Sequence, residues 1–275
     1  IFPTNLIDNL VVSKNFTADM PADFTGGLLN IETKDFPEER IVSASVSLGY
    51  NPQMNLTNDF LTYDGGGTDF LGFDDGARAL PSGAESANIP TPINGNSDRE
   101  VGDFIRSFNP ELGANRQTSL LDYSASVSLG NQIDLDNEKE GKLGYIFSLS
   151  YRNDYTYYDD VFYGEYQRVT DPADYEMIYA NDQFGQLGEQ SILIGGLAGL
   201  AYKTQYSKYR LTAMRLQNGE KRAGQFVIDN NGDAIGQSGY IALSDNLEYN
   251  QRSLTNFLLN GTHVLGDKGW EVDWR

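Results

Sequence analysis

Apolar and small polar residues alternate along several stretches of this chain. In residues 42–50 the even positions are Val, Ala, Val, Leu and Tyr, and the odd positions are Ser, Ser, Ser and Gly. Residues 121–130 and 143–151 repeat the pattern, with the apolar side chains at odd positions. Side chains alternate between the two faces of a β-strand, so each stretch is predicted to be a strand with one apolar and one small face.

Weaker alternation predicts four more strands, at about residues 190–204, 207–228, 252–266 and 268–275. A soluble β-sandwich normally pairs its apolar inner face with a charged outer face. The small hydroxylic face found here is more typical of a wall between lipid and a lumen. We therefore expect an all-β fold containing about seven strands of a transmembrane antiparallel β-barrel, and a soluble β-sandwich is the alternative.

The predicted connections differ in length. Short turns are expected at residues 134–142 and about 204–207, and long loops at about 52–117, 152–189 and 218–250. Short and long connections alternate in membrane barrels, whose periplasmic turns are short and whose outer loops are long. A structureless loop as long as 52–117 would be unusual in a compact soluble domain. The loop lengths therefore favour the barrel.

Composition narrows the function classes. The net charge of −19 makes nucleic acid an unfavourable partner, because phosphates would be repelled. The chain has no cysteine and one histidine, His263, which argues against a thiolate or histidine metal centre and a Ser-His-Asp triad. We expect no enzyme activity, no cofactor and no metal site, and we expect His263 to be a hydrogen-bonding residue of the lumen.

Residues 11–39, "VVSKNFTADMPADFTGGLLNIETKDFPEE", resemble the C-terminal end of the plug domain in TonB-dependent outer-membrane receptors. In that family the first barrel strand follows the plug directly, as the strand at 41–50 does here. Residues 68–81, "TDFLGFDDGARALP", resemble the first long outer loop of Bacteroidetes-type members. The plug end differs from that of the glycan-importing SusC-like branch, which disfavours a SusD-like lipoprotein partner.

The resemblance implies two regions. Residues 1–40 would be the end of the plug, and residues 41–275 the N-terminal part of a barrel of about 22 strands with long extracellular loops. The chain would then be a fragment of a longer receptor.

The function implied by the resemblance is TonB-dependent uptake of a scarce ligand across the bacterial outer membrane: a siderophore, haem, cobalamin, an oligosaccharide or a peptide. The implied partners are TonB with its ExbB/ExbD motor, outer-membrane lipid and lipopolysaccharide, and other surface subunits such as a lipoprotein. The alternative is a receptor-like barrel that acts as a scaffold within a surface complex, without transport.

The junction between plug and barrel is assigned to a short set of residues. Glycine permits positive φ or close backbone approach, and proline ends a strand because it lacks an N–H. A role in gating and a simple hinge between two domains both remain open for this segment. The junction residues are Gly26, Gly27, Asn30, Lys34 and Pro37.

Ligand contacts are expected from the aromatic run at residues 153–166, since exposed tyrosines stack on sugars or aromatic siderophores. The alternative is an aromatic strand top that extends beyond the membrane. The acidic residues at 59–75 favour a flexible acidic loop over a Ca²⁺ or ferric-ligand site, and residues 229–236 favour a polar loop tip over a Ca²⁺ loop. The candidate ligand-binding residues are Tyr155, Tyr157, Tyr158, Phe162 and Tyr163.

Overall fold

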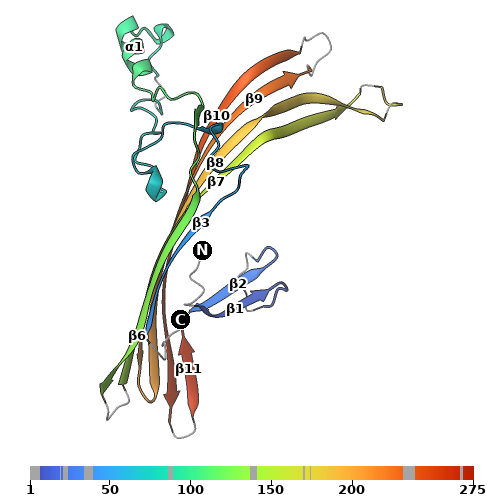
Figure 1. Ribbon diagram of the computed structural model, residues 1–275. Helices are drawn as coiled ribbons and strands as arrows, with labels where there is room; N and C mark the ends of the chain where they lie inside the picture. The colour runs from blue at the N-terminus through green and yellow to red at the C-terminus, as the bar shows by residue number, and fades with distance from the viewer. Residues whose placement is uncertain are drawn as a thin grey trace.

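The protein is all-β, and one large antiparallel sheet contains most of its strand residues (Figure 1). The structure, a computed structural model, describes residues 7–18, 20, 24–33, 40–85, 89–136, 141–169, 171–173, 175–231, 239–266 and 269–275. The strands and helices in these ranges are β1 (Ile7–Ser13), β2 (Leu28–Thr33), β3 (Ile41–Gly49), β4 (Phe60–Thr62), the 3₁₀ turns η2 (Asp69–Leu71) and η3 (Pro92–Asn94), α1 (Asp98–Arg106), β5 (Asn115–Gln117), β6 (Asp122–Asp136), β7 (Gly141–Arg168), β8 (Met177–Lys203), β9 (Ser207–Asn230), β10 (Tyr240–Leu265) and β11 (Trp270–Trp274).

The large sheet has seven strands in the order β11-β10-β9-β8-β7-β6-β3. The seven strands correspond to the seven predicted from the alternation, and each pair is antiparallel. Neighbours in the sheet are consecutive in the chain except for β3 and β6, which are separated by residues 50–121. The predicted short turn between β8 and β9 is confirmed: the Thr204 N–H donates to Ser207 O at 2.7 Å.

Three strands, β7, β8 and β10, are much longer than their alternating segments, whereas β9 is close to its predicted length. β7 has 28 residues, β8 has 27, β9 has 24 and β10 has 26. The prediction of long loops at 152–189 and 218–250 is therefore wrong, because most of both ranges continues as paired strand. The connections that remain are residues 169–176 and 231–239. Of the polar loop tip expected at 229–236, residues 232–236 lie outside the described ranges.

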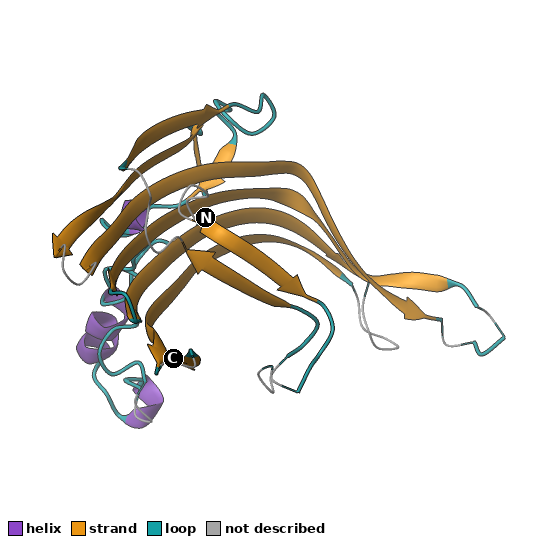
Figure 2. Ribbon diagram, turned by 90° about the horizontal axis from the view of Figure 1, so that it is seen from below, coloured by secondary structure: helices purple, strands orange, loops and turns teal. Residues whose placement is uncertain are grey.

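The sheet is curved (Figures 1 and 2), and side chains of different chemistry lie on its two faces. Registered pairs such as Val46↔Ala125 and Ala125↔Tyr151 place the alternating apolar positions of β3, β6 and β7 on the convex face, where apolar side chains of β8, β9 and β10 continue the band. The small residues of β3 and β6 lie on the concave face, where Ser45 Oγ and Ser126 Oγ are hydrogen-bonded at 2.8 Å. Further along this face, Ile146, Leu197 and Met214 of β7, β8 and β9 form an apolar cluster. The convex apolar band includes the exposed side chains of Val42, Val46, Leu48, Leu129, Phe147, Leu149, Leu200, Leu211, Phe257 and Leu259.

Aromatic residues border this band on the convex face. Near the turn between β8 and β9, the ring of Tyr209 lies 5.1 Å from the ring of His263. The indole N–H of Trp274 donates to His263 Nε2 at 2.9 Å. His263 is therefore hydrogen-bonded as expected, but it lies on the convex face and not on the predicted lumen face. Tyr123 and Tyr151 stack at 5.8 Å at the other border of the band.

A separate two-stranded hairpin, β1 and β2, lies on the concave side of the sheet (Figures 1 and 2). Asn30 is in β2, where it pairs with Val11 of β1. Gly26 has a φ of 145° just before β2, which confirms that glycine is needed there. Lys34 and Pro37 lie outside the described residues.

The long segment between β3 and β6 is folded over the upper part of the sheet. It contains the small β4–β5 sheet, both 3₁₀ turns and α1. In Figure 1 it lies on the side of the large sheet opposite to the β1–β2 hairpin, so it covers the convex face. None of the helices in the described part of the chain is long and apolar enough to cross a membrane.

Candidate functional site

The aromatic residues predicted to bind ligand do not lie together. Tyr155 and Tyr157 point to the convex face, where they are only 9% and 8% exposed. Tyr158 and Tyr163 are exposed and point to the concave face, as do Leu187 and Gln183, the residues of β8 with which they are paired.

Phe162 is exposed on the convex face, and its ring lies 4.8 Å from that of Phe184. Successive side chains of a strand point to opposite faces, so one strand cannot present the whole run to one ligand.

Tyr155 and Tyr157 are buried because the segment before β6 packs on them. Phe60 of β4 meets Tyr155 edge-on at 5.4 Å, and its neighbour Leu61 is fully buried. This core consists of Phe60, Leu61, Tyr63, Tyr155, Tyr157 and Ala223. The two tyrosines therefore anchor the segment to the sheet, and neither is available for stacking on a ligand from solvent.

Two glycines of the sheet permit this packing. A Cβ on Gly188 would collide with the carbonyl oxygen of Leu61, and one on Gly219 would lie 2.5 Å from Gly72 Cα. Gly72 has a φ of 72°, and its carbonyl oxygen accepts a hydrogen bond from Gln217 Nε2 at 2.5 Å. At Gly188 and at Gly219, the backbone of the segment thus lies directly against the backbone of the sheet.

Arg78 organises the acidic part of the segment. Its Nη1 and Nη2 donate to the two carboxylate oxygens of Asp69 at 2.9 and 2.5 Å, and its Nη1 donates to Asp74 at 3.0 Å. The guanidinium lies 4.0 Å from the ring centroid of Tyr249, which is in β10. Burial lowers the pKa of Arg78, but the hydrogen bonds to Asp69, Tyr63 and Asp74 outweigh it and the pKa is raised. The arginine therefore joins the segment to the sheet as a cation.

Burial, nearby charge and hydrogen bonds shift the pKa values of three neighbouring groups, Tyr249, Lys221 and Asp75. Burial, and next the Asp69 charge, raise the pKa of Tyr249 to about 12. Burial lowers the pKa of Lys221, whose Nζ donates to the Tyr63 carbonyl oxygen at 3.3 Å. Asp75 accepts hydrogen bonds from the N–H groups of Ala77 and Gly67, and these lower its pKa.

These contacts correct the prediction of a flexible acidic loop. Asp69 and Asp74 bind Arg78, and Asp75 accepts backbone hydrogen bonds. Within the described ranges, no group of three or more His, Cys, Asp and Glu side chains is placed to hold a metal ion. Sequence reasoning missed Arg78, although it is the sole cation between residues 41 and 98 and follows five of the loop's acidic residues.

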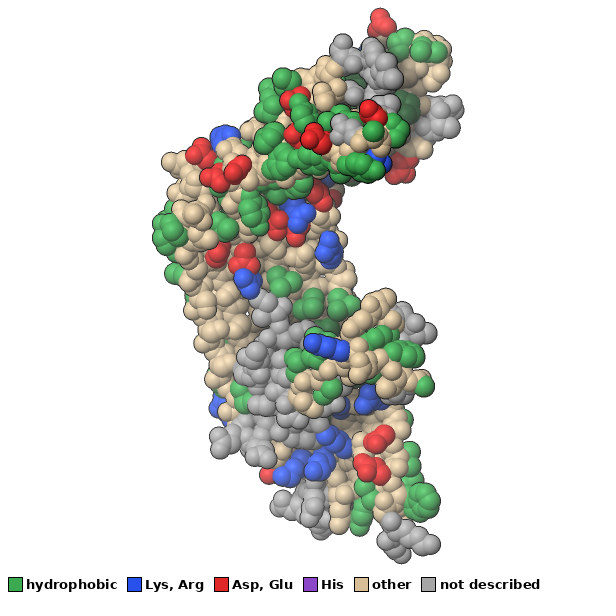
Figure 3. All heavy atoms as spheres, turned by 90° about the vertical axis from the view of Figure 1, so that its right-hand side faces the viewer, with side chains coloured by type: hydrophobic (Ala, Val, Ile, Leu, Met, Phe, Trp, Pro, Cys, Tyr) green, Lys and Arg blue, Asp and Glu red, His purple; other side chains and the backbone are tan. Residues whose placement is uncertain are grey.

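The concave face carries charged side chains beside its exposed tyrosines. Arg222 of β9 pairs with Glu189 of β8 at 2.9 Å and with Glu220 at 2.7 Å. Near the opposite end of the strands, Lys142, Lys203 and Lys208 are aligned across β7, β8 and β9. Figure 3, which looks from the right-hand side of Figure 1, shows lysine and arginine side chains gathered near this lower end.

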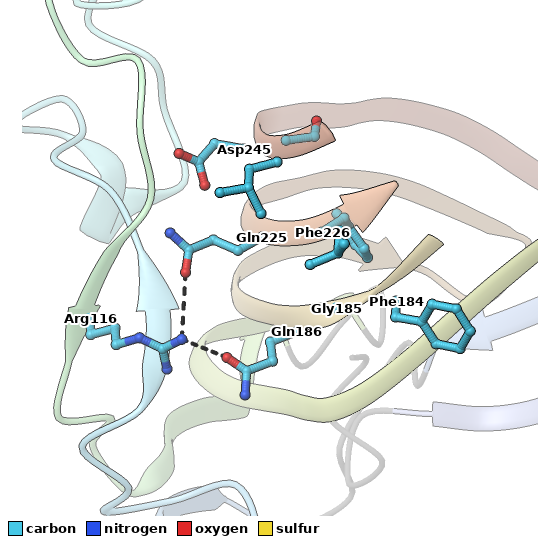
Figure 4. Close-up of a pocket in the computed structure, with 10 residues that line it drawn as sticks. Arg116, Phe184, Gly185, Gln186, Gln225, Phe226 and Asp245 are labelled. Atoms are coloured by element: carbon cyan, nitrogen blue, oxygen red, sulfur yellow. Dashed lines mark hydrogen bonds between the residues drawn. The ribbon is translucent and has the colours of Figure 1, made fainter. Parts of the chain in front are cut away.

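A pocket of about 410 Å³ lies between β5 and the upper parts of β8, β9 and β10 (Figure 4). Arg116 of β5 closes one side, where its Nη2 donates to Gln186 Oε1 at 2.6 Å and to Gln225 Oε1 at 3.5 Å. Phe184, Val227 and Leu243 supply apolar lining, and Asp245 lies at the edge. The pocket therefore combines an apolar floor with polar groups.

Comparison with known proteins adds no relative: no family model, no curated protein and no solved structure matches this chain.

Proposed function

We propose that this chain belongs to the wall of a TonB-dependent outer-membrane receptor that takes up a scarce ligand. The ligand class is a siderophore, haem, cobalamin, an oligosaccharide or a peptide. The two regions are residues 1–40, the end of a plug, and residues 41–275, the first strands of the barrel. Further strands would pair with the free edges of β3 and β11, because an open sheet edge is unstable in lipid.

One observation carries the proposal: the convex face of the seven-stranded sheet carries an exposed apolar band, and the facing concave positions of β3 and β6 are small and polar. That combination fits a wall between lipid and an aqueous or plug-filled lumen. The aromatic borders of the band, with Tyr209 and Trp274 at one and Tyr123 and Tyr151 at the other, match the interfacial girdles of such walls. The β1–β2 hairpin on the concave side fits the end of a plug.

Ligand contact is proposed for the upper concave face. Tyr158 and Tyr163 of β7 are exposed there, and the ion pair of Glu189 and Arg222 lies on the same face of the neighbouring strands β8 and β9. Aromatic faces with hydrogen-bonding charged groups suit a polar ligand with planar or sugar rings. Phe162 lies on the other face and has no part in this proposed site.

The proposed partners follow from this placement in the membrane. Outer-membrane lipid would contact the convex band, with lipopolysaccharide at its outer border. TonB and its ExbB/ExbD motor would supply energy through a part of the receptor that precedes residue 1. No enzyme activity is part of the proposal.

The membrane location is tested by extraction and gel mobility of the full-length protein. A barrel is expected in the detergent-extracted membrane fraction, and its gel mobility is expected to change on boiling. A soluble protein whose mobility boiling leaves unchanged would contradict the proposal. Transport is tested separately by ligand uptake in cells with and without TonB, and equal uptake would contradict energy coupling.

A second function, a scaffold subunit in a surface complex, is favoured by one observation. Residues 50–121 pack on the convex face and thereby present an additional outward surface beside the sheet. A scaffold predicts that uptake does not depend on TonB, while removal of residues 64–85 disrupts assembly with other surface proteins.

A further inference from the structure

Four apolar side chains form a straight row across the upper convex face. Strand pairing aligns Phe162 with Phe184, Phe184 with Val227, and Val227 with Leu243. All four are exposed, from 43% for Val227 to 86% for Leu243. Three of them also line the pocket beside Arg116 (Figure 4). A continuous exposed apolar row of this kind marks an interaction surface.

Carboxylates border the row on both sides. One row further along the strands, Asp182 and Asp229 lie directly opposite each other, and Ile241 follows in β10. On the other side, Asp245 is aligned with Gln225. Like charges directly opposite each other destabilise a sheet, so a cation between Asp182 and Asp229 would relieve repulsion. One oxygen of Asp182 is buried without a hydrogen-bond partner among the described residues.

The row lies outside the hydrocarbon if the apolar band spans the bilayer, as proposed above. Phe162 follows Tyr151, at the upper border of the apolar band, by eleven positions in β7. At 3.3 Å per residue the row lies about 35 Å further along the strand. A second copy of this chain is also disfavoured, because its net charge of −19 would face the same carboxylates.

We propose that this surface docks a basic, amphipathic segment of another protein. Apolar side chains of the segment would cover the row and enter the pocket, and its lysine or arginine side chains would pair with Asp182, Asp229 and Asp245. Apolar contact supplies affinity, while charge complementarity supplies orientation and specificity. This inference does not depend on transport, because the surface lies on the face opposite to the proposed ligand site.

The probes are two synthetic peptides of alternating sequence. One alternates leucine with lysine, and the other alternates leucine with glutamate. Their binding to the purified full-length protein is measured in a neutral detergent, with micelles alone as the blank. We expect the lysine peptide to bind the protein above the blank, the glutamate peptide to fail, and salt to weaken binding.

The variants separate this surface from general stickiness. Leu243→Glu is expected to lower the affinity for the lysine peptide about tenfold or more. The double change Asp182→Asn with Asp229→Asn is expected to lower that affinity several-fold. Tyr240→Glu adds the same charge to the concave face of the same strand and is expected to leave binding unchanged.

Three results would overturn the proposal: equal binding of both peptides, no effect of Leu243→Glu, or an equal loss in Tyr240→Glu. A fourth result that would overturn it comes from sedimentation of the protein without peptide, which measures self-association. Self-association that Leu243→Glu abolishes would identify a second copy as the occupant.

Discussion

At the scale of single residues, the packing of residues 50–121 depends on glycines in the sheet. Gly188 and Gly219 leave room for Leu61 and Gly72, whose backbones lie against them. A side chain at either position would push the segment away from Tyr155 and Tyr157. Gly196 is also on the convex face of β8, but a Cβ there would meet only the Arg215 carbonyl oxygen, at an ordinary contact distance of 3.9 Å.

Gly188→Ala is therefore expected to loosen the segment, because overpacking of this kind costs about 1–3 kcal/mol. The measurement is the rate of protease cleavage within residues 51–117. Gly196→Ala serves as the control, and the protease is expected to cleave this variant at the wild-type rate. Equal cleavage of wild type and Gly188→Ala would contradict the close packing of β4 on β8.

Arg78 gives a second prediction at this scale. Arg78→Lys removes the paired hydrogen bonds to Asp69 and the planar contact with Tyr249, which an ammonium cannot replace. The loss of charged hydrogen bonds is expected to cost about 1.5–3 kcal/mol, measured as faster cleavage between residues 64 and 85. Arg99→Lys is the matched control, since the Arg99 side chain is 91% exposed. If both variants cleave alike, Arg78 does not hold the segment.

At the scale of elements, the sequence predicts strands where apolar and polar residues alternate, and it fails where that alternation stops. The upper half of β7 carries polar or aromatic side chains on both faces, as in "NDYTYYDD" at 153–160. Register shifts between Tyr158 and Val161 and between Glu165 and Tyr166 also break the period. Backbone pairing continues through these irregularities, so the strand persists without its pattern.

The site is less predictable than the strands. Arg78 meets Tyr249 and Gly72 meets Gly219 across more than 140 positions of sequence, and no local pattern specifies either contact. The alternative interpretation of the aromatic run at 153–166, a strand extension, places it correctly, but its division between two faces depends on the register. Local alternation predicts which residues share a face, and tertiary packing decides which of them are covered.

The orientation of the strands gives a third prediction. The turn between β8 and β9 and the turn at residues 81–84 lie toward opposite ends of the proposed barrel. An epitope inserted after Gln205 is expected to be inaccessible to antibody on intact cells, whereas one inserted after Gly83 is expected to be stained. Permeabilised cells control for expression of both. Staining of the Gln205 insertion on intact cells would contradict the proposed orientation of the strands.

At the scale of the whole molecule, the two faces of the sheet predict opposite responses to charge. Phe257 points to the convex face, and the preceding Asn256 points to the concave face. Phe257→Arg is expected to destabilise the barrel by about 2–4 kcal/mol if its convex face contacts the bilayer midplane. Asn256→Arg is expected to cost much less. Equilibrium unfolding of the full-length protein from lipid vesicles measures both, and equal costs would argue against lipid at the convex face.

Residues 50–121 also have a mechanical consequence. The segment is hydrogen-bonded to Tyr151 of β7, Gln186 of β8, Gln217 of β9 and Gln251 of β10. A single stretch of chain thus contacts four neighbouring strands, and its hydrogen bonds add to the backbone hydrogen bonds that join these strands. Tyr151 and Gln217 lie at one level of the sheet, and Gln186 lies eight positions away from their partner Ile194 along β8. Shear between these strands would have to break side-chain contacts as well as the ladder. We therefore expect this part of the sheet to resist shear better than the strand ends beyond the segment.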